Sequence, residues 1–282
     1  LITAVFVGLF VSSLPYAEYK HISSKKIVTL VLVASLIILA FWTLAYLKKT
    51  VSLGYFRSGI NSLSTAKNEK ALENAESSFK TALVWDKSDI YYQALAEVVM
   101  IRIQSTGQQL LQVAQNNQKQ IDQKSLDILN SLLEKAIGYS RDAIQIDPTN
   151  YYNYISEARV SELALSLQVK NAYENVKNSY LSALRYNPYN PSIYLNLARI
   201  EASQNKFDEA QKYIGAALQV KPNYTEAIFL LSQIQVNNGQ IKDAIISTQF
   251  AIQTNPNNSL LHFQLGLLQY NDKNYQGAVD AL

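Results

Sequence analysis

The sequence predicts an all-α protein in which a transmembrane helix precedes a solenoid of short antiparallel helix pairs. The first observation behind this prediction is an uncharged apolar run of 21 residues from Ile27 to Leu47. The second is a set of prolines and alanines that return every 34 residues in the last part of the chain. A run of about 20 apolar residues matches the thickness of a bilayer core, and a fixed period of this length is typical of stacked repeats.

Composition supports a folded chain and excludes several classes of function. The 282 residues are 48% hydrophobic and 17% charged, so neither a disordered tail nor a fibre is expected. The sequence contains no cysteine, which excludes thiol catalysis, cysteine-bound zinc and iron–sulfur clusters. Residues 1–50 carry five lysines against the single acid Glu18, so the remaining 232 residues have a net charge of −1. A near-neutral body argues against a surface for nucleic acid.

The apolar run 27–47 has the flanks expected of a transmembrane helix. A pair of lysines stands directly before it and another pair directly after it. Trp42 and Tyr46 lie near its C-terminal end, where aromatic residues gather at membrane–water interfaces. A buried core helix is the alternative, although such helices rarely run for this length without a charge.

Residues 1–14 are a second apolar segment, too short to cross a membrane by itself. We expect a truncated transmembrane segment here, joined to the span 27–47 by the short basic loop 15–26. A signal-peptide core is the alternative, but it would need a basic leading region. Because the first residue is Leu1 and the last repeat stops midway, we expect an internal fragment of a longer polypeptide. The positive-inside rule then favours a cytoplasmic loop and an extracytoplasmic repeat array.

The repeats are visible as columns that share the 34-residue period. The members of these columns are Pro188, Pro222 and Pro256; Ala183, Ala217 and Ala251; Ala210, Ala244 and Ala278; and Ala198, Ser232 and Gly266. Within residues 191–224, one apolar helical face ends at 204–206, and a second amphipathic run from Phe207 to Val220 ends before the proline. Small residues let two antiparallel helices approach closely. Since neither helix can bury its apolar face alone, the pairs must stack.

One unit shows the full pattern, with Tyr194, Leu197, Ala198, Phe207, Ala210, Ala217 and Pro222 at fixed offsets. This pattern resembles the tetratricopeptide repeat (TPR), which implies a TPR-type α-solenoid of five to six units. By this resemblance, residues 151–282 are a regular TPR array whose last repeat is incomplete. Residues 52–150 resemble divergent TPR-like repeats with a long insertion near residues 105–125, more than a plain repeat turn needs.

The resemblance also implies a binding surface, because in the TPR family the first helix of each unit lines a concave face. The candidate binding residues on that face are Tyr152, Arg159, Asn196, Arg199, Phe229, Gln233, Asn237, Phe263, Gln264 and Asn271. A mixture of amides, arginines and exposed apolar groups suits an extended peptide, while a solvated face without a ligand is the alternative. The carboxylate-clamp subset of the family needs a lysine where this sequence has Leu195, Phe229 and Phe263, so that subset is not expected.

Two functions are compatible with these patterns. The first is a membrane-anchored TPR scaffold in the bacterial inner membrane, non-catalytic in this fragment, that binds a protein or peptide partner. It contacts the lipid bilayer, and no nucleic acid or cofactor is expected. A metal or catalytic site is not expected either, because His21 and His262 lack the neighbouring residues that such a site needs.

The second function follows from another resemblance. An apolar span, a basic loop, a final span and then repeats are similar to O-antigen ligase or polymerase-like glycosyltransferases with C-terminal TPRs. Residues 55–59 and 83–86 also resemble that group. This resemblance implies that the catalytic part lies upstream of Leu1, and only in this case is a glycan expected as a partner.

Overall fold

The computed structural model describes residues 24–66, 68–117 and 122–282, and every regular element within these ranges is an α-helix. The predicted segment 1–14 and most of the loop 15–26 lie outside the described residues. The chain forms two compact units, residues 1–51 and residues 52–282. The all-α prediction is confirmed.

The first unit is described by the helix α2, which spans Ser24–Ser64 and whose residues from Ser52 onward belong to the second unit. The helix begins three residues before the expected loop ends, so residues 24–26 are helical and not part of a loop. Its most apolar stretch has a mean hydropathy of 2.5 and none of it is buried, so the alternative of a buried core helix does not hold. Ser35 and Thr43 donate their hydroxyls to the carbonyls of Leu32 and Ala40, both at 2.8 Å, which removes their need for water. By length and composition this helix can cross a membrane.

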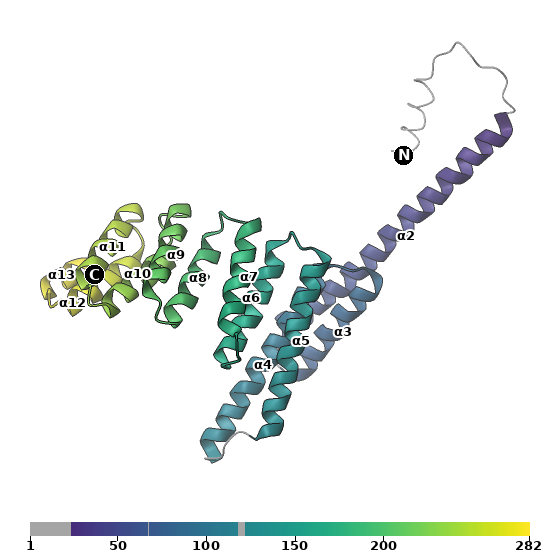
Figure 1. Cartoon of the computed structure of the whole chain (residues 1–282). Helices are drawn as coiled ribbons and strands as arrows, with labels where there is room; N and C mark the ends of the chain where they lie inside the picture. The colour runs from purple at the N-terminus through teal and green to yellow at the C-terminus, as the bar shows by residue number, and fades with distance from the viewer. Residues whose placement is uncertain (1–23, 67, 118–121) are drawn as a thin grey trace, which may run out of the picture. The chain divides into compact units, whose positions relative to one another are not determined.

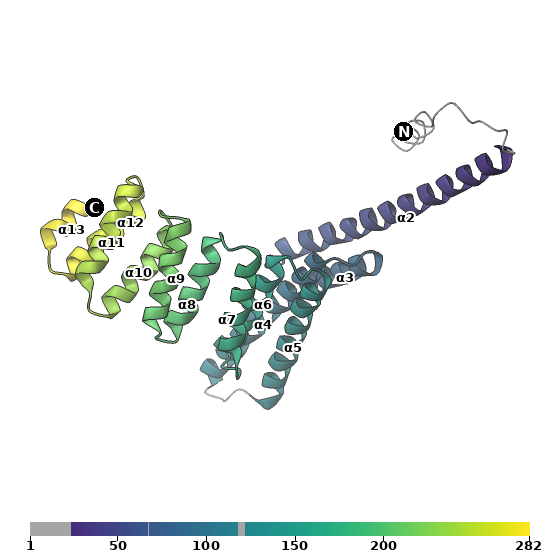
Figure 2. The same cartoon turned by 45° about the horizontal axis from the view of Figure 1, so that its top comes forward.

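The second unit is a succession of antiparallel helix pairs that lie side by side in chain order (Figure 1, Figure 2). After the end of α2, its helices are α3 Glu69–Trp85, α4 Asp89–Asn117, α5 Gln123–Ile146, α6 Tyr151–Ser166, α7 Ala172–Tyr186, α8 Pro191–Ser203, α9 Phe207–Val220, α10 Thr225–Asn237, α11 Ile241–Thr254, α12 Ser259–Asn271 and α13 Tyr275–Ala281. From α4 onward, each even-numbered helix packs most closely on the helix that follows it. This order confirms an α-solenoid.

The small-residue columns lie where the paired helices touch. Ala198, Ala210 and Ala217 have no exposed surface, and Ser232 and Gly266 are also buried. In the α10–α11 pair Ser232 takes the place of Ala198, and its hydroxyl lies 3.2 Å from that of Thr248, while Ala244 and Ala251 stay buried. The predicted period therefore identifies the contact line between the two helices of each pair.

The turns before α6, α8 and α12 share a local design that starts from their proline. An asparagine two residues after the proline accepts a hydrogen bond from the backbone of the next helix, as Asn150 and Asn190 do from residues 152 and 192. Such a side chain satisfies a free N–H at the start of the helix. Six residues after the proline, a side chain returns to the proline carbonyl: the Tyr154 and Tyr194 hydroxyls donate to Pro148 and Pro188, and His262 contacts Pro256 at 2.9 Å. These bonds hold the start of a helix pair against the end of the pair before it.

The predicted insertion near residues 105–125 lengthens two helices and does not form a long loop. The helix α4 continues to Asn117, and α5 begins at Gln123. Ile103 and Leu133 are buried in one apolar cluster, with Leu110 packed against it. The extra residues extend an apolar contact between two antiparallel helices. The many glutamines and asparagines of this segment did not indicate such a contact.

The close approach of α8 and α9 gives a stability test. We expect Ala217→Leu to lower the free energy of unfolding by about 1–3 kcal/mol, because this fully buried position has no room for a larger side chain. Chemical denaturation of the full chain measures the change. Gln219 is exposed on the same helix, so Gln219→Leu should change stability by less than about 0.5 kcal/mol. Equal stability of the two variants would contradict the packing.

Candidate functional site

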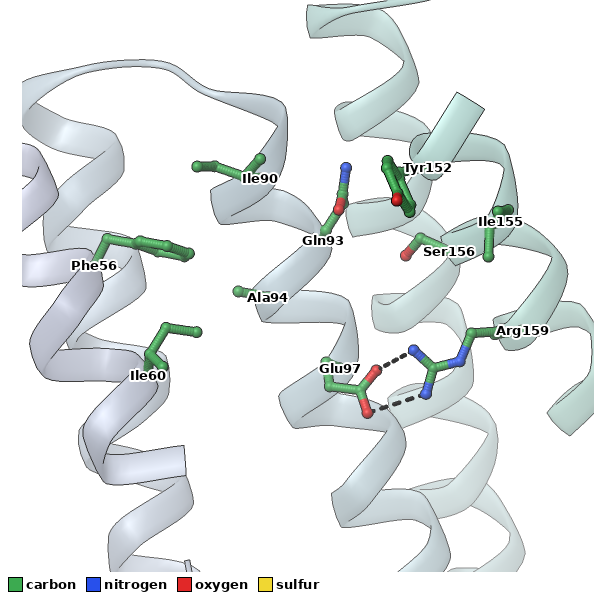
Figure 3. A pocket seen from close by; sticks show the side chains of 10 residues that line it. All are labelled: Phe56, Ile60, Ile90, Gln93, Ala94, Glu97, Tyr152, Ile155, Ser156 and Arg159. Carbon is green, nitrogen blue, oxygen red and sulfur yellow. Dashed lines mark hydrogen bonds and ion pairs between the residues drawn. The ribbon is translucent and has the colours of Figure 1, made fainter. Parts of the chain in front are cut away.

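A hollow of about 480 Å³ opens between the end of α2, the start of α4 and the start of α6 (Figure 3). All its walls belong to the second unit. Its lining residues are Phe56, Ile60, Ile90, Gln93, Ala94, Glu97, Tyr152, Ile155, Ser156 and Arg159. Two of the ten predicted binding residues, Tyr152 and Arg159, are among them.

One wall of the hollow is apolar and is held in place by aromatic packing. Phe56 and Ile60 project from α2 on one side of α4 (Figure 3). The Phe56 ring packs on the rings of Phe79 and Tyr91, with centroids 5.5 and 5.0 Å away. Gly59 allows this arrangement, since a Cβ there would lie 2.6 Å from Cδ1 of Phe79. The wall therefore offers a preformed apolar surface next to water, of the kind that buries a ligand side chain.

The opposite wall is polar and centres on an ion pair between α6 and α4. The Arg159 guanidinium contacts both carboxylate oxygens of Glu97, at 2.7 and 3.1 Å (Figure 3). About half of the Arg159 side chain and a third of the Glu97 side chain are exposed. An exposed pair of this kind contributes at most about 1 kcal/mol to stability, so a ligand can replace either partner at small cost.

A buried asparagine fixes the two helices that carry this pair. Asn153 has no exposed surface, and its Nδ2 donates to the Asp89 carboxylate and to the carbonyls of Ala143 and Asp147, at 3.0, 3.0 and 2.7 Å. Gln93 donates to the Oδ1 of the same asparagine. A buried amide with all its partners present specifies one arrangement. The relative position of α4 and α6, and with it the shape of the hollow, is therefore defined by polar bonds.

A second arginine on the next first helix, α8, has a different environment. Arg199 is exposed and contacts Asn196 at 3.4 Å, and among the described residues it forms no ion pair. Arg199 acts electrostatically on Glu162: burial raises the pKa of this carboxyl, while the Tyr180 hydroxyl, Arg159 and Arg199 oppose that rise. The Tyr180 hydroxyl donates to Glu162 at 2.7 Å. Arg199 is thus an exposed donor with capacity for an oxygen ligand.

The other predicted residues divide into exposed, half-buried and buried positions. Gln233, Asn237 and Asn271 are exposed, and Phe263 is 50% exposed beside a second hollow at the end of the array. Asn196 and Phe229 are half-buried.

The exposure predicted for Gln264 is wrong, because only 6% of this residue is accessible, and Leu195 is likewise buried with 1% accessible. The 34-residue period puts Gln264 in one column with Leu230, which is half-buried. This column lies at the margin of the face formed by the first helices. Gln264 also lies one turn from the buried residues Leu261 and Leu268, on the packed side of α12. Leu195 packs into the apolar cluster shared by α8, α9 and α10.

The residues that α2 and α4 bring to the hollow were not predicted from the sequence. Gly59 is a signal that could have placed Phe56 and Ile60. It marks the small-residue position of a first helix, once the end of α2 is taken as the first helix of a pair. The signal was weak because Lys87 stands at the proline position of that unit, and the lengthened α4 and α5 interrupt the period.

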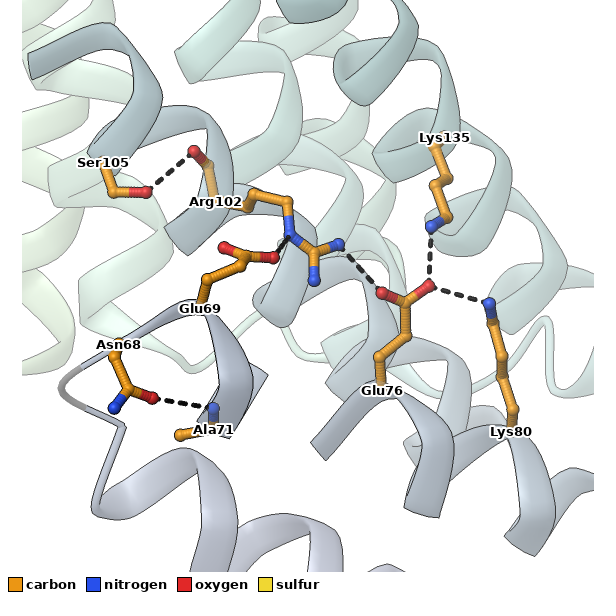
Figure 4. A network of polar contacts seen from close by, with 8 residues as sticks. All are labelled: Asn68, Glu69, Ala71, Glu76, Lys80, Arg102, Ser105 and Lys135. Atoms are coloured by element: carbon orange, nitrogen blue, oxygen red, sulfur yellow. Dashed lines mark hydrogen bonds and ion pairs between the residues drawn. The ribbon is translucent and has the colours of Figure 1, made fainter. Parts of the chain in front are cut away.

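A second polar cluster, on α3, α4 and α5, has the character of a structural contact (Figure 4). The carboxylate of Glu76 receives Lys135 at 2.6 Å, and Lys80 and Arg102 at 2.8 Å each. Burial opposes its ionisation, but the hydrogen bonds from the three cations outweigh burial and lower the pKa of Glu76 to about 2. Since the carboxylate is surrounded by side chains of its own fold, the cluster joins three helices.

Comparison with known protein families supports a repeat protein. A tetratricopeptide-repeat family model matches residues 201–246, which include the end of α8, all of α9 and α10, and the start of α11. A search of curated proteins finds no significant match to the sequence.

Solved structures similar to this chain include two that are described as TPR proteins. YrrB, a TPR protein with an unusual peptide-binding site, is 19% identical over 72% of this chain and 88% of its own, with a TM-score of 0.43. TTC0263, a thermophilic TPR protein of Thermus thermophilus, is 15% identical over 78% of this chain and 99% of its own, with a TM-score of 0.48. The MamA protein is 14% identical over 72% of this chain and 91% of its own, with a TM-score of 0.49.

The Glu76 cluster predicts a pH-dependent loss of stability. The unperturbed pKa of 4.5 exceeds the folded value of about 2, so the carboxylate stabilises the fold above about pH 4.5 and this contribution is lost as the pH falls through 2. We expect Glu76→Gln to lower the free energy of unfolding at neutral pH by about 3 kcal/mol, since three cations lose their partner. Urea unfolding at a series of pH values measures the difference from the unmodified chain, which should shrink between pH 4.5 and 2. Glu73→Gln, at an exposed position of the same helix, is the control. A pH-independent difference would contradict the role of the charge.

Proposed function

We propose that this chain is a membrane-anchored scaffold whose repeat array binds an extended peptide segment of a protein partner along the first helices of its units. One observation carries the proposal: the apolar hollow at α2, α4 and α6 lies beside Arg159, and the exposed Arg199 follows on the next first helix.

An extended peptide has two kinds of group that this surface accommodates. One apolar side chain can enter the hollow against Phe56, Ile60 and Ile155 and leave water there. The peptide backbone presents free N–H and C=O groups that the amides of Gln93 and Gln233 can meet, since amides both donate and accept. The match of a TPR family model to residues 201–246 supports this kind of role, because stacked helical repeats present extended surfaces to partners.

Arg199 defines the polarity of the proposed ligand. A guanidinium has five donors and no acceptor, so it needs a carbonyl or carboxylate oxygen. Because Arg199 forms no ion pair within the described residues, a bound acidic side chain would not have to displace a competing carboxylate. We therefore expect the bound segment to present an acidic residue to Arg199 and an apolar residue to the hollow.

The anchor in this proposal is the apolar part of α2. Its length, its mean hydropathy and its lack of buried residues support a membrane span over 27–47, although a signal sequence near an N-terminus has the same properties. We place the chain in a bacterial inner membrane with the repeat array on the extracytoplasmic side, following the charge of the loop 15–26. The alternative of a glycosyltransferase tail with upstream catalysis stays a prediction, which the sequence preceding Leu1 decides.

Peptide selection tests the groove. A displayed library of random peptides is selected against the full chain in lipid nanodiscs, and the affinities of the selected peptides are measured by titration. We expect Arg199→Glu to weaken binding by about tenfold or more, because a charge-assisted hydrogen bond is worth about 1.5–3 kcal/mol. Arg185→Glu, at an exposed position in the last turn of α7, is the matched control and should leave affinity unchanged. Peptides that bind both variants equally would refute the groove.

Membrane extraction and topology test the anchor. We expect the full chain to stay with the membrane fraction after alkaline carbonate treatment, because a spanning helix is not removed by charge disruption. A periplasmic reporter fused after Leu282 should be active and a cytoplasmic one inactive. Release of an intact chain by carbonate, or cleavage near residue 47 as in a processed signal sequence, would contradict the anchor. If the cytoplasmic reporter is active and the periplasmic one inactive, the repeat array lies on the other side of the membrane. That result would change the orientation and leave the anchor standing.

A further inference from the structure

The start of the repeat array lies at the edge formed by the turn between α3 and α4. Ser52, the first residue of the second unit, is buried, and its hydroxyl contacts the Ala82 carbonyl at 3.1 Å and the Tyr91 hydroxyl at 2.7 Å. Ala82 lies one turn before the end of α3, and Tyr91 lies in the first turn of α4. The chain therefore enters the array at the level of this turn.

Large apolar side chains are exposed around that point. Val84 is 81% exposed and Trp85 43% exposed at the end of α3, and Leu53 and Tyr55 are 45% and 42% exposed in the first turn after Ser52. Trp85 and Ala82 are three residues apart on one helix, which is about 4.5 Å along its axis. We call Leu53, Tyr55, Val84 and Trp85 the edge patch.

The chemistry of the edge patch is that of a membrane–water interface. Tryptophan and tyrosine prefer the headgroup level, where the ring is shielded and the polar atom stays hydrated. Arg57 and Lys87 are exposed next to the patch in sequence, and Asp86 lies between Trp85 and Lys87. These three side chains have a net charge of +1, which anionic lipids attract. Val84 and Trp85 stand at the C-terminal end of α3, and Leu53 and Tyr55 lie within α2 next to Ser52, which contacts that end of α3.

Chain length limits how far the edge patch can lie from the bilayer. The apolar run ends at Leu47, and Ser52 follows five residues later. Even a fully extended chain of five residues spans only about 18 Å. The headgroup region on each side of a bilayer is several ångströms thick, so this connection is short enough to allow a contact between the patch and lipid.

We propose that the edge patch inserts into the headgroup region of the bilayer, so that the first repeat binds the lipid surface directly. The inference rests on the membrane anchor proposed above and goes beyond it. The occupant of the patch is lipid, and a protein partner or a second copy of the chain is excluded if the test below succeeds.

The two tryptophans of the sequence make the test selective. Trp42 lies in the apolar run and Trp85 in the edge patch, so Trp42→Phe leaves Trp85 as the only indole. The full chain carrying Trp42→Phe is reconstituted into vesicles of phosphatidylcholine and phosphatidylglycerol, with either brominated or ordinary acyl chains. We expect loss of Trp85 fluorescence in the brominated vesicles, since bromine quenches only indoles near the acyl region. Unchanged fluorescence would overturn the proposal.

A pair of valine variants tests whether the patch causes the contact. Val84→Glu, in the Trp42→Phe background, should abolish the quenching of Trp85, because a carboxylate is repelled by anionic lipid and costly to dehydrate. Val279 is 70% exposed on α13, so Val279→Glu is the matched control and should leave the quenching unchanged. Both positions are exposed, so folding is retained, and helical circular dichroism checks it. Equal quenching in the two variants would overturn the role of the patch.

The complementary variant separates this inference from the anchor. In Trp85→Phe, the remaining Trp42 reports on the apolar run alone. Quenching of Trp42 without quenching of Trp85 would leave the anchor standing and overturn the lipid contact of the edge patch. Absence of quenching at both positions would overturn the anchor as well, and both proposals would fall together.

Discussion

The close approach of two antiparallel helices at a line of small side chains is the constraint on which the repeat array depends. Ala210 and Ala217 on α9 and Ala198 on α8 have no exposed surface, and Gly266 plays the same part in the last pair. A pair held at this distance buries only one face of each helix, so an apolar face remains for the next pair. Stacking then follows from burial of apolar surface, and the first helices of successive pairs come to share one face of the array. The candidate site exists because of that shared face.

Polar bonds decide how one pair meets the next. Asn153 joins Asp89, Gln93 and two carbonyls between the α4–α5 and α6–α7 pairs, and the proline carbonyls receive a side chain from the helix that follows. Apolar packing alone tolerates small rotations, whereas a buried amide with several partners specifies one arrangement. The hollow beside Arg159 is therefore a consequence of polar bonds between pairs, and its apolar wall a consequence of Gly59, which lets Phe79 and Phe56 meet.

Charge divides the array into contacts that hold the fold and groups that face water. Glu76 is enclosed by three cations and has a pKa lowered to about 2, so its charge is committed to joining α3, α4 and α5. Arg159 has an exposed carboxylate partner, and Arg199 has only an amide. The guanidinium of Arg199 on α8 is thus more available to a ligand than that of Arg159 on α6. The edge patch is distinct from this face, since it combines the end of α3 with the part of α2 that directly follows Ser52.

The sequence by itself determined the all-α class, the apolar helix and the helix pairs of residues 151–282, because Pro188, Pro222 and the alanine columns act locally, within one pair or one turn. It also placed Tyr152 and Arg159 on one face, and both line the hollow. Only the tertiary structure decided that Leu195 and Gln264 are buried, that the residues near 105–125 lengthen α4 and α5, and that Glu97 meets Arg159 across 62 positions of the chain. These features depend on the rotation between successive pairs, which arises from side chains far apart in sequence and leaves no mark in a 34-residue period.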